Sequence, residues 1–441
     1  MSIPHLHAIG EIIRKVRKEK GFRLEDVADE NISPATISNI ERGIPHVNPE
    51  KVRYLLDKLG LEMSEIPARL AEESKRLKNL EFQLDSAYLL WSLNKGDAAL
   101  NKVNQINIKD GNPLAARLYF IKGLCFFSKK QWKRAEREYY QAIKIVNEHP
   151  FYENSNLEAQ CFHELGMTYY YQNDLEKALD FANTGIDAYK ENGDLPYLRY
   201  GLRSNKAVYL DKLGRINEGM QTIQEVWGSI DPGHESKHVT LLYWLKAEFL
   251  RKTGMNDEAL KYANQGLEIS RRNEYCKFIM DFLMTLGSIY AKLVQWDKAK
   301  DCFTIAIETR HQLKDVTALA TPYTRLGVIQ MNEENWDEAK RLLKEAIKIA
   351  GDDLPRLSYA LMFMGDFYHK QNQPQEAIYY YERALKKMGS FHPTLKSKLY
   401  LRLANLWEDA DKDEFKKHFR NMNKVRMLQK EKEMDVFDEI V

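Results

Sequence analysis

Histidine and cysteine are the residue types in this 441-residue chain that could support metal or nucleophilic chemistry. His163 and Glu164 begin a pattern like that of the zinc proteases, but Met167 stands where the second metal-binding histidine would be needed. No nucleotide-binding glycine loop occurs in the sequence. Neither metal-ligand spacing nor a disulfide framework is present among the four cysteines, which are Cys125, Cys161, Cys276 and Cys302. The sequence therefore predicts reduced thiols, no metal, no cofactor and no catalytic residue.

Polar side chains near the N-terminus would be positioned by four short helices between residues 8 and 60. The first helix has apolar residues at helical spacing, and we expect it to end at Gly21. After a second short helix, a tight turn is expected at Asn31, because asparagine tolerates a left-handed conformation. Ser33 and Asn48, each followed by proline, are expected to be the N-caps of the third and fourth helices.

This order of helices resembles the helix-turn-helix of the Cro and phage-repressor family. The stretches that carry the likeness are IRKVRKEKG, VADENISPATISNIERG and LLDKLGL. The resemblance implies that the third helix enters the major groove of DNA. Its candidate base-contacting residues are Pro34, Ala35, Thr36 and Asn39. Candidate phosphate contacts are Arg14, Arg17, Lys18, Arg23 and Arg42.

Charge leaves a second interpretation of this N-terminal domain open. The chain has a net charge of only +2, so DNA binding needs a local basic patch. Residues 1–66 carry ten basic and eleven acidic side chains, although six of the ten basic ones cluster between Arg14 and Arg23. The domain is therefore expected to bind DNA, and the alternative is a helix-turn-helix kept only for dimerisation or docking.

Most of the remaining chain is a repeat array. Gly123 is followed by Phe126, Ala135, Tyr139 and Ala142, and the pattern recurs every 38 to 43 residues. The other copies start at Gly166, Ala207, Ala247, Gly287, Gly327, Gly365 and, less clearly, Ala87. Small residues let two helices pass closely, and large residues fill the gaps between them. The pattern resembles the tetratricopeptide repeat. It predicts an all-α fold in which the helix-turn-helix domain is followed by a right-handed superhelix of helix pairs.

These patterns predict the domain organisation of the chain. We expect a helix-turn-helix domain at 1–66, a helical connector at 67–84, the repeat array at 85–423 and a charged tail at 424–441. The N-terminus lacks the apolar stretch of a signal peptide, and no apolar run is long enough to cross a membrane. The sequence therefore predicts a cytoplasmic protein without a membrane partner.

A helix-turn-helix followed by tetratricopeptide-like repeats resembles the RRNPP group of peptide-responsive regulators. The resemblance implies a homodimer that binds operator DNA, with a short signalling peptide held in the groove of the repeats. It also implies that peptide binding changes DNA binding, as in quorum sensing. Rap-type members of the same group bind response regulators and can act on them as phosphatases. A regulator that binds a response regulator, with or without such activity, is therefore the alternative.

Groove-facing positions lie about six, three and two residues before the small residue of each repeat, and one and four residues after it. An asparagine there can hold a peptide backbone through both its amide donor and its acceptor, and an arginine can bind a carboxylate by two bonds. The candidate peptide-binding residues are Asn205 first, then Arg117, Arg251 and Arg325, followed by His163, Tyr170 and Asp211.

Overall fold

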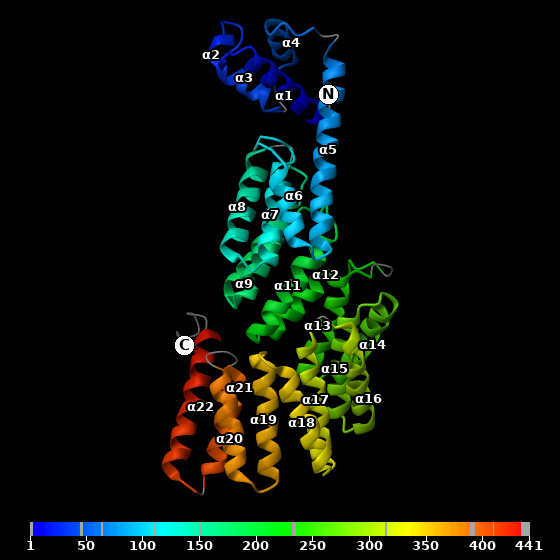
Figure 1. Ribbon diagram of the computed structural model, residues 1–441, viewed down its shortest axis with the longest axis vertical. Helices are drawn as coiled ribbons and strands as arrows, with labels where there is room; N and C mark the ends of the chain where they lie inside the picture. The colour runs from blue at the N-terminus through cyan, green and yellow to red at the C-terminus, as the bar shows by residue number, and fades with distance from the viewer. Residues whose placement is uncertain are drawn as a thin grey trace. The chain divides into compact units, whose positions relative to one another are not determined.

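The computed structural model describes residues 3–44, 47–62, 65–109, 111–149, 152–231, 235–313, 315–388, 393–408 and 410–433. The chain forms two compact units, Met1–Ile230 and Asp231–Val441. Within the described ranges the chain is almost entirely helical, and the only β-type pairing is an isolated bridge between Asp29 and Ile32. The predicted all-α class, with a helix-turn-helix followed by tetratricopeptide-like helix pairs, is confirmed (Figure 1).

Four helices form the N-terminal domain: α1 (Ile3–Glu19), α2 (Leu24–Val27), α3 (Pro34–Glu41) and α4 (Pro49–Lys58). The predicted ends and caps are confirmed. Gly21 follows α1 with a φ of +74°, a left-handed conformation that glycine adopts without steric cost. The Ser33 hydroxyl accepts the Thr36 N–H at 3.2 Å, and the Asn48 side-chain oxygen accepts the Glu50 N–H at 2.9 Å.

The turn before α3 is made differently from the prediction. Asn31 does not adopt the left-handed conformation. Instead, one carboxylate oxygen of Asp29 accepts the backbone N–H groups of Asn31 and Ile32 at 2.9 and 3.1 Å. The other oxygen accepts the Tyr54 hydroxyl at 2.6 Å and an ion pair from Lys58. The side-chain bonds of Asp29 thus hold the turn and connect it to α4, and the left-handed conformation expected at Asn31 is not needed.

One long helix, α5 (Ile66–Ser92), is shared by the N-terminal domain and the repeats (Figure 1). Near its start, Ile66 is buried in the core of the helix-turn-helix, and Leu70 packs against that core. Near its end, Leu84 and Ala87 are fully buried in the first repeat core. The two cores are therefore joined by continuous helix and not by a loop.

The helix pairs of the first unit begin with α5 and α6. Besides α5, the helices of these pairs are α6 (Gly96–Gln105), α7 (Ala115–Ser128), α8 (Trp132–Glu148), α9 (Leu157–Tyr171), α10 (Leu175–Ala188), α11 (Leu198–Leu213) and α12 (Ile216–Trp227).

The second unit continues the helix pairs from α13 to α22. Its first helices are α13 (Lys237–Thr253), α15 (Cys276–Lys292), α17 (Ala320–Asn332), α19 (Leu354–Lys370) and α21 (Pro393–Trp407). Its second helices are α14 (Asn256–Arg272), α16 (Trp296–Glu308), α18 (Trp336–Ala350), α20 (Pro374–Met388) and α22 (Lys412–Glu433). Two 3₁₀ turns, η2 (Thr309–Gln312) and η3 (Val316–Leu319), lie between α16 and α17.

The small residue of each repeat faces the large residue sixteen positions later. A Cβ added to Gly287 would lie 2.5 Å from the ring of Phe303, and one added to Gly327 would lie 2.8 Å from Leu343. Gly123 is covered in the same way by Tyr139. The large side chains are fully buried, so the glycine is what lets the second helix approach the first. This packing explains the spacing that identifies the repeats.

Neighbouring pairs pack with their first helices closer together than their second helices. In the first unit α7 contacts α9 and α9 contacts α11, and in the second unit α13 contacts α15 and α17 contacts α19. Among the described helices, the second helices of neighbouring pairs make no comparable contacts. Within each unit the first helices therefore lie on the inner, more tightly curved side.

Candidate functional site

The outer face of α3 carries the residues predicted to contact bases. Pro34 and Ala35 are exposed, and Thr36 and Asn39 are half-buried beside them. The Thr36 hydroxyl lies 2.9 Å from the hydroxyl of the N-cap serine, and the Asn39 side-chain oxygen accepts Arg42 at 2.6 Å. The amide NH₂ of Asn39 has no hydrogen-bond partner within the described chain. This face therefore offers one amide donor group and two small apolar side chains to a partner.

Arg17, predicted as a phosphate contact, has a structural partner instead. Its guanidinium is buried and forms two bonds to Glu41, at 2.5 and 2.9 Å. A third bond, of 2.6 Å, goes to the carbonyl oxygen of Phe22. The hydrogen bond to Glu41 is the largest influence on Arg17 and raises its pKa. Arg17 therefore holds α3 against α1 and does not present a charge at the surface.

The other predicted phosphate contacts lie nearer to solvent. Lys18, Arg23 and Arg42 are exposed, and they come from α1, the segment before α2 and the end of α3. Arg14 is half-exposed and lies 3.8 Å from Glu11. Three of the five basic candidates thus remain accessible around α3, and Arg14 is partly engaged by its own helix.

In the first unit, two predicted groove residues come together on neighbouring first helices. Asn205 of α11 is buried, and its amide nitrogen lies 2.9 Å from Nε2 of His163 on α9. The other ring nitrogen of His163 lies 3.1 Å from Glu164. Tyr170 stacks on Tyr209 with ring centres 5.4 Å apart. The polar atoms of this face therefore already form a hydrogen-bonded layer across α9 and α11.

Arg117 and Asp211 were predicted for the same face, and Arg117 bonds to a different helix. Arg117 of α7 forms an ion pair with Asp85 of α5 and lies 4.0 Å from Glu81. Asp211 is half-buried near the end of α11. Arg117 is therefore neutralised by α5, the helix that also enters the helix-turn-helix core.

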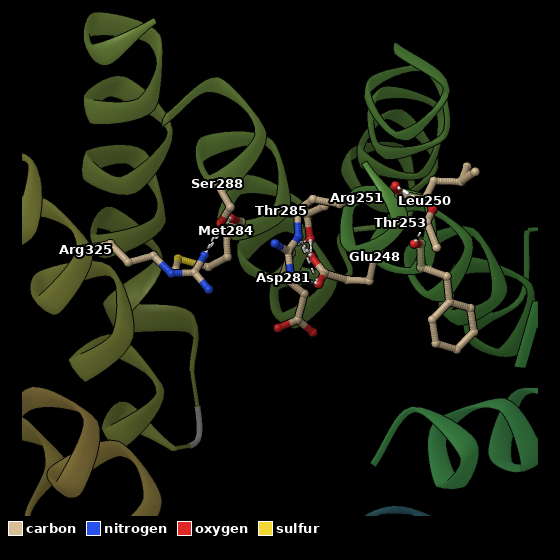
Figure 2. Close-up of polar contacts among 10 residues, drawn as sticks. Glu248, Leu250, Arg251, Thr253, Asp281, Met284, Thr285, Ser288 and Arg325 are labelled. Carbon is tan, nitrogen blue, oxygen red and sulfur yellow. Dashed lines mark hydrogen bonds and ion pairs between the residues drawn. The ribbon is translucent and has the colours of Figure 1, made fainter. Parts of the chain in front are cut away.

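In the second unit, Arg251 lies in a polar cluster shared by α13 and α15 (Figure 2). Its guanidinium bonds Glu248 at 3.1 and 2.7 Å, and the Thr285 hydroxyl donates to the same carboxylate at 2.6 Å. Burial raises the pKa of Glu248, but the bonds from Arg251 and Thr285 outweigh burial and leave that pKa below its ordinary value. Glu248 therefore stays ionised and satisfied.

Arg325 of α17 reaches across to α15. It donates to the carbonyl oxygen of Met284 at 2.8 Å and to the Ser288 hydroxyl (Figure 2). Its guanidinium also lies 5.7 Å from the centre of the Phe303 ring. No carboxylate of the described chain forms an ion pair with Arg325, and burial lowers its pKa. Its positive charge is therefore not neutralised by a carboxylate.

Asp281, one turn before Thr285 on α15, was not among the predicted residues. Its carboxylate makes no hydrogen bond or ion pair with any described residue, and burial raises its pKa to about 6. Figure 2 shows the side chain pointing away from the Glu248–Arg251 pair. The sequence did contain a signal, because Asp281 lies six residues before Gly287, the same offset that selects Arg117 before Gly123.

The inner face of the second unit is also hollowed near its C-terminal end. A cavity of about 350 Å³ lies among the first helices α17, α19 and α21. Within it, Asp366 accepts two bonds from Arg402, at 2.6 and 2.9 Å, and the Tyr381 hydroxyl at 2.6 Å. Other lining residues are Asn332, Phe363, His369 and Lys370. The first helices therefore do enclose space that a ligand could enter.

No group of three histidine, cysteine or acidic side chains in the described ranges is placed to hold a metal ion. Cys125 is buried, and burial raises the pKa of its thiol to about 11. Cys161 is buried as well, with its pKa also raised. These thiols are protonated at neutral pH and are poor nucleophiles. None of the helices in the described ranges has the length and apolarity that a membrane span requires.

Comparison with known families identifies both parts of the chain. Residues 13–66 match the helix-turn-helix family. Tetratricopeptide repeats match at residues 114–191, 241–273 and 318–388. No curated protein matches the chain in sequence.

Two solved structures resemble the fold over most of its length. The apo form of the quorum sensor NprR from B. thuringiensis is 13% identical, covers 85% of this chain and 100% of its own, and has a TM-score of 0.57. A Rap protein complexed with Competence and Sporulation Factor is also 13% identical, covers 80% of this chain and 99% of its own, and has a TM-score of 0.55. At this identity the likeness concerns the fold.

Fold and sequence together define a protein with a helix-turn-helix domain followed by tetratricopeptide repeats. This combination agrees with the domain order expected from the resemblance to the RRNPP group, and the likeness to NprR and Rap supports the fold.

Proposed function

We propose that this protein is a peptide-responsive transcriptional regulator of the quorum-sensing type. Its N-terminal domain binds operator DNA, and the inner face of its repeats binds a short signalling peptide. It acts in the cytoplasm as a homodimer and carries out no reaction of its own. The observation that supports this most directly is α5, a single helix whose two ends are buried in the helix-turn-helix core and in the repeat core.

The DNA-binding half of the proposal rests on the outer face of α3. Pro34, Ala35 and the free amide group of Asn39 are directed to solvent there, where an adenine edge or a thymine methyl could meet them. Lys18 and Arg23 are exposed beside this helix and supply positive charge for phosphates. Arg17 is left out of this set because it serves the packing of α1 on α3.

The peptide-binding half rests on polar groups along the first helices. Asn205 and His163 offer amide and imidazole groups on α9 and α11. Arg325 carries a charge without a carboxylate partner on α17. A peptide laid across neighbouring first helices within one unit would contact the groups of that unit, and it would favour the spacing of helix pairs that fits it best.

The first experiment is a selection of genomic DNA fragments with the purified full-length protein. It is run with and without a small-peptide extract of the host's culture medium. Enrichment of specific fragments that changes with the extract is the expected result. A Thr36→Val/Asn39→Ala variant, which leaves the buried residues of α3 intact, should lose the enrichment. Asn205→Ala should keep the enrichment and lose its dependence on the extract.

Other outcomes of this selection separate the parts of the proposal. Enrichment that ignores the extract would leave a DNA-binding protein with a different input. If no fragment is enriched in either condition, DNA binding by this domain is refuted. Binding to a response regulator, tested by co-purification with the host's own response regulators, would then be the function to pursue.

A further inference from the structure

The cavity among α17, α19 and α21 is lined by residues that were not among the predicted peptide contacts. Its volume of about 350 Å³ lies near the lower end of the range for ligand pockets, about 300 to 1,000 Å³. A space of this size admits a small part of a peptide and not its full length. Because the lining comes from three neighbouring first helices of the second unit, one bound group would contact all three.

Part of the cavity lining is apolar and belongs to the core. Val328 and Met331 lie one helical turn apart on α17, and Phe363 of α19 packs in the same hydrophobic cluster. Met331 is buried, and the other two side chains are half-buried. Because these side chains are held by the packing of the repeats, they offer a preformed surface on which an apolar side chain of a ligand can be buried.

The polar part of the lining has more free donors than free acceptors. Asp366 is the one carboxylate among the described lining residues. Its oxygens already accept two bonds from Arg402, at 2.6 and 2.9 Å, and one from the Tyr381 hydroxyl at 2.6 Å. The side-chain oxygen of Asn332 accepts Nζ of Lys370 at 3.0 Å. The remaining N–H groups of this lysine and this asparagine are therefore available to an acceptor from a ligand.

Lys370 also gives the cavity an uncompensated positive charge. It is the last residue of α19, it is exposed, and its described bond goes to a neutral amide. The charge of Arg402, in contrast, is compensated by Asp366. His369 and Asn405 are exposed at the rim, and each can donate a further N–H. The cavity therefore places an apolar surface beside a donor-rich, positively charged rim.

We propose that this cavity binds an apolar residue of the peptide together with an adjacent carboxylate. The apolar side chain packs on Val328, Met331 and Phe363. The carboxylate accepts hydrogen bonds from Lys370 and Asn332. It is the terminal carboxylate of the peptide or the side chain of an aspartate or glutamate next to the apolar residue, which share the same chemistry toward an ammonium group. This inference rests on the proposed peptide binding and gives it a subsite with a defined ligand chemistry.

The test uses full-length protein and two randomised synthetic heptapeptide pools, one with free and one with amidated carboxyl termini. Peptides retained by the wild type, by Lys370→Met and by Lys292→Met are identified by mass spectrometry. Methionine keeps an unbranched side chain and removes the charge. Lys292 is the matched control, because it is the exposed last residue of α15, as Lys370 is of α19, and it does not line the cavity.

We expect the wild type and Lys292→Met to retain peptides with an apolar residue beside a carboxylate on the order of tenfold better than peptides without the carboxylate. Lys370→Met should still retain peptides but should lose this acidic preference. If amidation abolishes the preference in the wild type, the carboxylate is the peptide terminus; if the preference survives amidation, the carboxylate is a side chain.

Three results would count against the inference. An acidic preference that Lys370→Met keeps would belong to another cation of the inner face, and it overturns this inference alone. The same holds if the wild type retains peptides without regard to the carboxylate or to the apolar residue beside it. If the wild type retains no peptide from either pool, peptide binding by the repeats fails and the inference fails with it.

Discussion

Replacing Asp281 by asparagine should make the protein more stable at neutral pH. Most substitutions of a buried residue destabilise a protein, because they remove contacts or leave a partner unsatisfied. Asp281 has no partner within the described chain, so its ionised form contributes a desolvation cost and no compensating bond. Asparagine fills the same space without a charge.

The size of the effect follows from the pKa of the carboxyl group. Burial raises the pKa of Asp281 to about 6 from an ordinary value of 3.8. That separation corresponds to roughly 3 kcal/mol between the ionised and neutral forms in the folded state. Because the folded-state pKa is the higher one, this contribution is complete below pH 3.8 and is lost as the pH rises through 6. The advantage of Asp281→Asn should therefore be near zero at pH 4 and reach about 3 kcal/mol above pH 7.

Thermal unfolding of wild type, Asp281→Asn and Asp301→Asn at several pH values measures this difference. Groups common to all three proteins cancel when the variants are compared at the same pH. In a unit of this size, 3 kcal/mol corresponds to a rise of roughly 6–12 °C in the midpoint. Asp301 is exposed on α16 and is the control, so Asp301→Asn should change the midpoint little at any pH. The reasoning is refuted if Asp281→Asn is no more stable than wild type at pH 7, or if its advantage persists at pH 4.

Three other substitutions test the packing and the proposed DNA contacts. Gly287→Ala places a methyl group against the fully buried ring of Phe303 and should lower the free energy of unfolding by about 1–2 kcal/mol, even after the gain in helix propensity. Gly228→Ala, which has open space around it, is the control and should leave the thermal unfolding midpoint unchanged. Arg17→Met leaves Glu41 buried without its partner and should lower the stability of the N-terminal domain by roughly 3–5 kcal/mol in urea unfolding; a loss below about 1 kcal/mol would contradict the buried ion pair. Lys18→Ala should weaken binding to all DNA sequences alike and reduce the salt dependence by about one phosphate contact, as measured by fluorescence anisotropy; an unchanged salt slope would remove Lys18 from the interface.

The fold could be predicted from the sequence because its rules are local and repeated. Gly287 and Phe303 are sixteen residues apart in sequence, and the same pair of sizes recurs at Gly123 and Tyr139. Each copy requires the same close approach of two helices, so the recurrence of the pattern identifies the repeat from sequence alone. The caps of α3 and α4 were predictable for a similar reason, since serine or asparagine followed by proline acts within a few residues.

The state of individual charges could not be predicted, because it depends on contacts between distant residues. Arg17 lies in the basic stretch of α1, yet its partner Glu41 is 24 residues away on α3. In the groove, the offset rule selected Arg117 for its chemistry, but Asp85 on α5 already neutralises that charge. The same rule also selects Asp281, and only the folded structure distinguishes it as the group without a partner.

In the proposed function, coupling between the DNA-binding domain and the peptide-binding repeats depends on α5. Its 27 residues span about 40 Å, and Ile66 and Leu84 fix opposite ends in separate cores. The stretch between these cores is largely exposed and carries charged residues, with Arg76 and Glu73 paired on the surface at 3.1 Å. A helix held at both ends transmits a rotation or tilt of one core to the other, whereas a flexible linker would absorb it. A ligand that shifts the first helices of the repeats would therefore act on α3 through α5, without needing to contact the helix-turn-helix domain itself.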